Sequence, residues 1–239
     1  MSPPGGPISC TNGAHPPPDP PSVTRPLYDL PPGLTLRFAA PRPGGALPLD
    51  ALSAEERARL EAFGHPDRQL GFALGRTAAR SLLAERLGVG PPEAPLAVAL
   101  DGGLVVEGHP LHLSLAHAGR GPEALAVAAL AEDHPVGVDL ERVAPRHPDL
   151  LRRLLLPEEA PLLDALPLDE HDAPVLLWAL KEAVLKGLRT GFRRPARSVR
   201  LLSLDDGRGQ ADLGDHTWAL RYGRHGPFWL AVAFPEGGA

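Results

Sequence analysis

The sequence predicts an α/β (α+β) fold made of two similar halves. The first indication is the order of the patterns, in which helical segments precede a group of strands and a further long helix precedes a second group. The second is a repeat: a shift of 106 lays 73–80 over 179–186, and a shift of 105 lays Leu125-Ala-Val-Ala128 over 230–233. Because the chain is rich in alanine and leucine and has the same tetrapeptide at 96–99, chance similarity is the alternative.

Composition limits the class of protein. A chain of 239 residues that is 43% hydrophobic can bury one large core or two small cores with a shared interface, and we expect one compact, monomeric unit. Its net charge of -5, with cations spread along the chain, argues against nucleic acid as a main ligand. The single cysteine, Cys10, excludes an intramolecular disulfide. With no membrane-length apolar run and no signal-peptide pattern, we expect a cytoplasmic protein with no membrane partner.

We expect three segments along the chain. Residues 1–33 hold eleven of the thirty prolines and few large apolar side chains, so this segment is predicted to be a disordered tail. The predicted N-terminal half covers 34–131, and the predicted C-terminal half covers 132–235.

Three helices are predicted from start and stop signals. Ser53-Ala-Glu-Glu56 has the pattern of a capping box, which predicts a helix over 54–63. Leucines at helical spacing predict a second helix over 68–87, which Gly88 would end. A third helix is predicted over 173–188.

Seven apolar runs between glycine, proline or aspartate turns are predicted as strands. They are 96–100, 111–115, 125–130, 136–143, 199–204, 216–222 and 228–234. In the fourth run, the period of two places Asp139 and Glu141 on the face shared with Gly137. An ordinary strand with a solvated polar face is one interpretation. A ligand site, with room left by Gly137, is the other.

The third predicted helix carries Glu182 and Lys186, which project from the same face as Trp178. A surface salt bridge beside a core tryptophan is the ordinary interpretation. Lys186 and Lys181 are the only lysines, and arginine occupies every other cationic position. A position that keeps lysine is expected to need a compact ammonium, although chance also places two lysines side by side.

Asp139, Glu141 and Glu182 would together offer hard oxygen ligands of the kind that suits magnesium, which often binds phosphate oxygens as well. The implied substrate class is a pyrophosphate. His117 ends a predicted strand before a glycine turn and is a further candidate, although a histidine at a strand end is commonly structural.

Two motifs resemble a known family. Gly137-Val-Asp-Leu-Glu141, followed by Trp178-Ala-Leu-Lys-Glu-Ala-Val-Leu-Lys186, resembles the paired signature of the 4'-phosphopantetheinyl transferases, specifically the larger, pseudo-dimeric Sfp type. Leu156-Pro-Glu-Glu159 lies between them, where that family has a short segment ending in glutamate. The resemblance spans about residues 47–235. It implies two halves related by a pseudo-twofold, each an antiparallel sheet packed against a long helix.

The resemblance implies transfer of 4'-phosphopantetheine from coenzyme A, the co-substrate, to a serine of an apo acyl or peptidyl carrier protein in fatty-acid or secondary-metabolite biosynthesis. Adenosine 3',5'-bisphosphate is released. Magnesium on Asp139, Glu141 and Glu182 would bridge the pyrophosphate and offset its negative charge. Glu182, directly or through a metal-bound water, would take the serine proton as general base. Lys186 would bind and neutralise, or protonate, the leaving phosphate.

Other segments are similar to the coenzyme A contact regions of the family and supply candidate phosphate ligands. These are Arg59, Arg76, Arg80, Ser114 and His117. Two departures stand out: the Ser-His-Ser of the family is Ala-His-Ala at 116–118, and its Gly-Lys-Pro corresponds to Gly-Gly-Leu at 102–104. The carrier is expected to dock near 150–166.

Two other functions are compatible with these residues. A magnesium-dependent nucleotide pyrophosphohydrolase needs the same acids but uses water as the nucleophile. A non-catalytic carrier-binding protein would keep the fold, but its motif acids would be expected to decay, and here they are intact.

Overall fold

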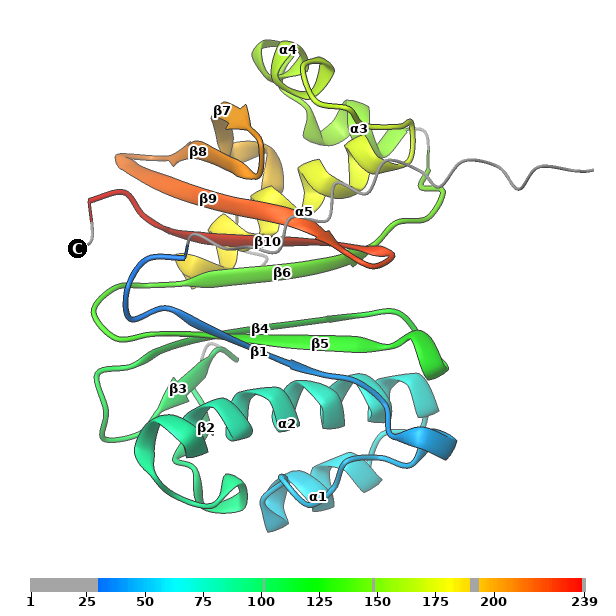
Figure 1. Cartoon of the computed structure of the whole chain (residues 1–239), viewed down its shortest axis with the longest axis vertical. Coiled ribbons are helices and arrows are strands. Elements are labelled where there is room, and N and C mark those ends of the chain that lie inside the picture. The colour runs from blue at the N-terminus through cyan, green and yellow to red at the C-terminus, as the bar shows by residue number, and fades with distance from the viewer. Residues whose placement is uncertain (1–29, 101, 148, 190–193, 238–239) are drawn as a thin grey trace, which may run out of the picture.

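The computed structural model describes residues 30–100, 102–147, 149–189 and 194–237 (Figure 1). Within these ranges the helices are α1 (Ala54–Glu61), α2 (Pro66–Leu87), α3 (Asp149–Leu154), α4 (Ala160–Asp164) and α5 (Asp172–Gly187). The strands are β1 (Thr35–Ala39), β2 (Leu96–Val98), β3 (Leu104–Val106), β4 (His112–Ala118), β5 (Leu125–Ala131), β6 (Gly137–Arg142), β7 (Arg200–Asp205), β8 (Arg208–Leu213), β9 (His216–His225) and β10 (Phe228–Pro235). None of these helices is long and apolar enough to cross a membrane.

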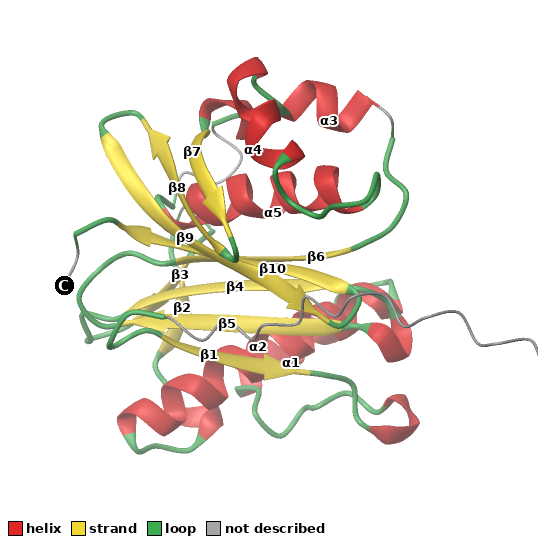
Figure 2. Cartoon of the chain, turned by 45° about the horizontal axis from the view of Figure 1, so that its top comes forward, coloured by secondary structure: helices red, strands yellow, loops and turns green. Residues whose placement is uncertain are grey.

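Two antiparallel sheets lie between two layers of helices (Figures 1 and 2). One has the strand order β1-β5-β4 and the other β6-β10-β9-β8-β7, while β2 and β3 form a separate hairpin. The mixed α/β fold with antiparallel sheets is therefore confirmed. Most of the predicted tail, 1–29, lies outside the described residues, whereas Leu30 already packs against the core between the sheets.

Alternation along the central strands builds three apolar layers. On β10, Leu230 and Val232 face the other sheet, whereas Ala231 and Ala233 face α5. On β5, Val127, Ala129 and Ala131 face the second sheet, and the intervening residues face α2. Each long helix thus covers the outer face of one sheet, and the inner faces pack together.

The predicted helix signals have the expected structures. The Ser53 hydroxyl accepts the Glu56 amide at 3.3 Å, and the Glu56 carboxylate accepts the Ser53 amide at 3.1 Å, which confirms the capping box. Helix α2 begins at Pro66, earlier than predicted, because a proline in the first turn needs no hydrogen-bond acceptor. It ends at Gly88, whose φ of 70° is left-handed.

Each of the seven predicted strand runs contains a strand, whereas β1, β3 and β8 were not predicted. Strand β3 is only three residues long, and β8 turns Gly209, Ala211 and Leu213 inward. Small inward residues give little hydrophobic contrast, so the alternation of β8 is weak in the sequence.

Helix α5 lies unusually close to β6 at Gly137. A Cβ atom at Gly137 would collide with the Ala183 carbonyl oxygen and would lie 2.5 Å from the Gly187 nitrogen. The interpretation that Gly137 leaves room for a ligand is therefore wrong, because the α5 backbone fills that space. The glycine instead brings a helix against the strand.

We expect Gly137→Ala to lower the free energy of unfolding by about 3 kcal/mol, because the added methyl group must push two backbones apart. The denaturant midpoint measures this change. Gly64→Ala is the matched control, since a Cβ atom there meets nothing within 4 Å. Equal midpoints for the two variants would contradict the close approach.

Candidate functional site

Strand β6 sends its two acidic side chains toward α5. Val138 and Leu140 are buried in the core between the sheets, and Asp139 and Glu141 lie on the opposite face, as the alternation predicted. Only 5% of Asp139 is exposed, so its carboxylate depends on protein groups for its polar contacts.

Lys186 on α5 connects Asp139 with the other sheet. Its Nζ lies 2.6 Å from Asp139 Oδ1 and donates a hydrogen bond to the Leu115 carbonyl on β4 at 3.4 Å. About a third of the Lys186 side chain is exposed, so the ammonium is open to solvent and to a ligand. The structure thus brings the strand motif and the helix motif together at one point.

The acids beside Lys186 repel one another. Burial raises the pKa of Glu182, and the charge of Asp139 raises it further, while Lys186 acts in the opposite direction. Burial and Asp139 also raise the pKa of Glu141, although Arg146 donates to Glu141 Oε2 over 2.5 Å and opposes this effect. A bound cation would relieve this repulsion.

The predicted magnesium ligands fit a hard cation in their chemistry. Asp139 Oδ2 is buried and has no hydrogen-bond partner within the described ranges, so this carboxylate oxygen could bind a cation. The side chains are not gathered around one point, because no group of three or more acids, histidines or cysteines that could hold a metal ion occurs in the described part of the chain. The magnesium triad therefore stays a prediction.

His117 is the next-to-last residue of β4 and lies beside α2 at Gly71. A Cβ atom at Gly71 would lie 2.8 Å from its ring, so one side of the imidazole packs directly on the helix. Loss of water lowers the pKa of His117, and the charge of Lys186 lowers it further, against the effect of Asp139. The neutral imidazole is therefore favoured at neutral pH, and its role would be hydrogen bonding rather than a fixed charge.

A cavity of about 470 Å³ opens where β4 and β6 end, and it is lined by His117 and Glu141. Three arginines that the sequence did not single out line it as well, namely Arg120, Arg142 and Arg146. Guanidinium groups suit phosphate oxygens. An anion would have to share Arg142 and Arg146 with Glu123 and Glu141, which pair with them and also line the cavity. In the sequence, Arg120 directly follows Gly119, and Arg142 directly follows Glu141. Arginine is so common in this chain that these two positions alone do not indicate a ligand site.

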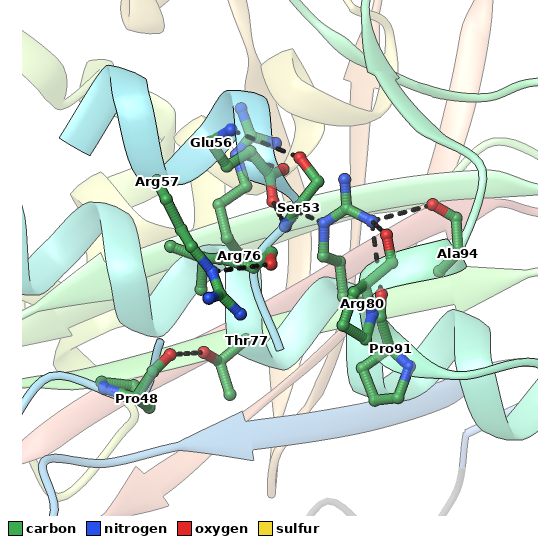
Figure 3. A network of polar contacts seen from close by, with 11 residues as sticks. Pro48, Ser53, Glu56, Arg57, Arg76, Thr77, Arg80, Pro91 and Ala94 are labelled. Carbon is green, nitrogen blue, oxygen red and sulfur yellow. Dashed lines mark hydrogen bonds and ion pairs between the residues drawn. The ribbon is translucent and has the colours of Figure 1, made fainter. Parts of the chain in front are cut away.

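Arg80, a predicted phosphate ligand, is buried and already has several protein partners (Figure 3). Its Nε lies 2.5 Å from Glu56, and its Nη1 donates to the carbonyls of Pro91, Pro92 and Ala94. Because only 3% of Arg80 is exposed, these contacts hold α1, α2 and the segment after α2 together.

Arg76 and Arg59 are more available to a ligand. Arg76 Nε lies 3.4 Å from Glu56, but its Nη1 is buried and has no hydrogen-bond partner among the described residues. Both guanidinium groups lie over the Phe72 ring, with Cζ at 5.1 Å for Arg76 and 5.7 Å for Arg59. Burial lowers the pKa of Arg76. An anion beside this pair would restore favourable electrostatics.

Ser114 connects the sheets. Its hydroxyl accepts the Val138 amide at 3.0 Å, and 7% of the residue is exposed. This contact links β4 to β6 next to Asp139. The predicted contact of Ser114 with coenzyme A stays a prediction, since its hydroxyl already has a structural partner.

Residues 135–233, which contain β6 and α5, match the family described as the 4'-phosphopantetheinyl transferase superfamily. The chain is 27% identical over 167 residues to a 4'-phosphopantetheinyl transferase of Bacillus subtilis, a match that covers 69% of this chain and 72% of that protein. It is 31% identical over 151 residues to the 4'-phosphopantetheinyl transferase HetI of Nostoc sp. (strain PCC 7120), covering 60% of this chain and 62%, less than two thirds, of HetI.

The matched region includes both motifs, and the structure joins Asp139 of the first to Lys186 of the second. The predicted resemblance is therefore confirmed at the level of the superfamily. Over residues 135–233 the chain is similar to the 4'-phosphopantetheinyl transferase superfamily, and this match and the two relatives identify it as a transferase.

Proposed function

We propose that this chain transfers 4'-phosphopantetheine from coenzyme A to a serine of an apo acyl or peptidyl carrier protein and releases adenosine 3',5'-bisphosphate. The observation that carries the proposal is the meeting of Asp139 on β6 with Lys186 on α5 beside an arginine-lined cavity. Acids and cations that lie close together suit a pyrophosphate ester and a metal ion. The names of both relatives support the transfer.

In this reaction, the serine oxygen bonds to the phosphorus that carries the pantetheine arm. The bond between that phosphorus and the bridging oxygen breaks, and its electron pair leaves with the adenosine bisphosphate. Glu182 is the proposed general base, since its raised pKa makes it a better proton acceptor than an ordinary glutamate. Lys186, whose side chain is about a third exposed, is proposed to neutralise or protonate the leaving phosphate.

Asp139, Glu141 and Glu182 are the proposed magnesium ligands. A bound divalent ion supplies positive charge that offsets the charge of a pyrophosphate. The unpartnered Asp139 Oδ2 and the raised pKa of both glutamates support this set.

For coenzyme A, the contacts favour Arg59 and Arg76 over Arg80 as phosphate ligands, because Arg80 is 3% exposed and its Nε and Nη1 already bind Glu56 and three backbone carbonyls. His117 and Ser114 stay in the proposal as candidate ligands. The cavity adds further candidates, Arg120, Arg142 and Arg146.

We further infer the Sfp type, with a coenzyme A-binding half over 34–131 and a catalytic half over 132–235 that are related by a pseudo-twofold. Support comes from the internal repeat, which pairs α2 with α5 and β5 with β10, each helix covering an antiparallel sheet. The chain is proposed to act as a cytoplasmic monomer in fatty-acid or secondary-metabolite biosynthesis. The carrier is proposed to dock near 150–166, where Leu150 and Leu155 are half-buried.

The first test is incubation of the chain with coenzyme A, magnesium and a panel of apo carrier domains. We expect the carrier mass to increase by the phosphopantetheine group. Glu182→Gln should abolish transfer because the base is lost, and His117→Ala should only reduce it, by about 10-fold for one charge-assisted hydrogen bond.

Glu170→Gln, at an exposed acid outside the cavity, is the control and should transfer at the wild-type rate. No mass increase with any carrier would refute the proposal. Hydrolysis of coenzyme A without a carrier would instead favour the pyrophosphohydrolase.

A second test separates the two kinds of arginine. Arg59→Met should raise the KM for coenzyme A by about 10-fold with an unchanged denaturation midpoint, because the exposed side chain makes few internal contacts. Arg80→Met should lower the free energy of unfolding by about 3 kcal/mol, since it leaves the partly buried Glu56 without its closest cation. The reverse assignment of effects would contradict the contacts described for Arg80.

A third test uses pH. A raised carboxyl pKa means that the folded chain holds the proton more tightly than the unfolded chain, so this stability is lost as pH rises through the folded pKa of Glu182. Glu182→Gln should therefore raise the denaturation midpoint at about pH 8, with no gain at about pH 3, where both states are protonated.

In the wild-type chain, kcat/KM should fall as the pH becomes acidic, because the base must be ionised. Glu170→Gln should leave both profiles unchanged. A gain of stability at about pH 3 as large as at about pH 8 would show that charge is not the cause.

A further inference from the structure

Lys181, the other lysine of the chain, is completely buried and has no part in the proposed chemistry. It lies on α5 directly before Glu182. Its side chain and that of Glu159, at the end of the 3-10 helix η4 (Pro157–Glu159), are 0% exposed. A buried charge is costly unless its hydrogen bonds are satisfied, so the surroundings of this pair must supply specific partners.

The pair has a complete set of such partners. Lys181 Nζ lies 2.8 and 2.9 Å from the two Glu159 oxygens and 2.7 Å from the Val199 carbonyl, so three acceptors meet the three ammonium donors. Glu159 in turn accepts the Leu201 and Leu156 amides, each at 2.8 Å. The pair therefore ties α5 to η4 and to β7.

We propose that Glu159 and Lys181 form a positioning pair that fixes the rotation of α5 and so keeps Glu182 and Lys186 on the face that meets β6. Successive helical residues lie about 100° apart, so Lys181 reaches the side of η4 and β7 while Glu182 lies near Asp139. A roll of α5 would shift both Glu182 and Lys186 against Asp139. The effect of the pair on catalysis rests on the proposed function, whereas its effect on the rotation of α5 does not.

Stability alone does not explain such a pair. Replacement of a buried ion pair by apolar side chains of similar size is often neutral or stabilising, while the ionic version fixes one arrangement of its neighbours. Leucine-rich packing around α5 is available for the purely stabilising role, since Val175, Leu176 and Leu177 are all fully buried. The hydrogen bonds of Lys181 are directional, and packing is not.

The test is the double variant Glu159→Leu/Lys181→Met, which removes both charges and keeps similar side-chain size. We expect a KM for coenzyme A within about twofold of wild type and a kcat at least about 10-fold lower for the folded fraction. The denaturation midpoint should fall, because the Val199 carbonyl and the Leu156 and Leu201 amides lose their partners. Amide hydrogen exchange in 181–187 should become faster, because the helix is less firmly held. Arg86→Gln/Glu132→Gln removes an exposed pair at 2.9 Å and is the control, with no change expected in any of these quantities.

A double variant with wild-type kcat and wild-type exchange would overturn the proposal, and so would a lower midpoint with full kcat for the folded fraction. If the double variant fails to fold, Glu159→Gln keeps the shape and one acceptor and is judged by the same quantities. Failure of the wild-type chain to modify any carrier would refute the proposed function instead. In that case, hydrogen exchange in the double variant would still test whether the pair holds α5. Unchanged exchange rates in 181–187 would refute the positioning role.

Discussion

The backbone contact between β6 and α5 is the constraint on which the site depends. Gly137 has no side chain, so the turn of α5 from Ala183 to Gly187 comes directly against the strand. Asp139, one step further along the same face of the strand, then lies within reach of Lys186. The same proximity lets the Lys186 ammonium contact the Leu115 carbonyl on the other sheet. A larger side chain at 137 would hold the helix away and separate these groups.

This close packing concentrates negative charge, and the chain offsets it only in part. Lys186 pairs with Asp139 and Arg146 with Glu141, yet the pKa of both Glu141 and Glu182 is raised. The site therefore reduces stability at neutral pH, which is typical of residues kept for function rather than for folding. On the same helix, the buried Lys181 has every donor satisfied. Lys181, whose charge is fully hydrogen-bonded, and Glu182, whose charge is unfavourable in its surroundings, are thus adjacent residues of α5.

Elements with strong local signals could be predicted, and those defined by distant contacts could not. The capping box at Ser53 and the stop at Gly88 gave α1 and α2 because each signal satisfies hydrogen bonds within a few residues. Strand β8 was missed because two of its three inward residues, Gly209 and Ala211, are small, and because its neighbours β7 and β9 support it on either side. The pairing of β6 with β10 joins segments far apart in the chain, so spacing alone does not reveal it.

In the site too, local patterns could be predicted from the sequence, and contacts between distant residues could not. Periodicity placed Asp139 beside Glu141 and Glu182 beside Lys186, but the contacts of Arg80 and Glu159 join separate elements and carry no local pattern. The rarity of lysine nevertheless pointed to two positions where the structure shows specific contacts of the ammonium group. Lys181 meets three acceptors arranged around a single nitrogen, and Lys186 reaches a buried carboxylate and a carbonyl at once. The lysine ammonium presents three donors from one compact nitrogen, which suits both positions.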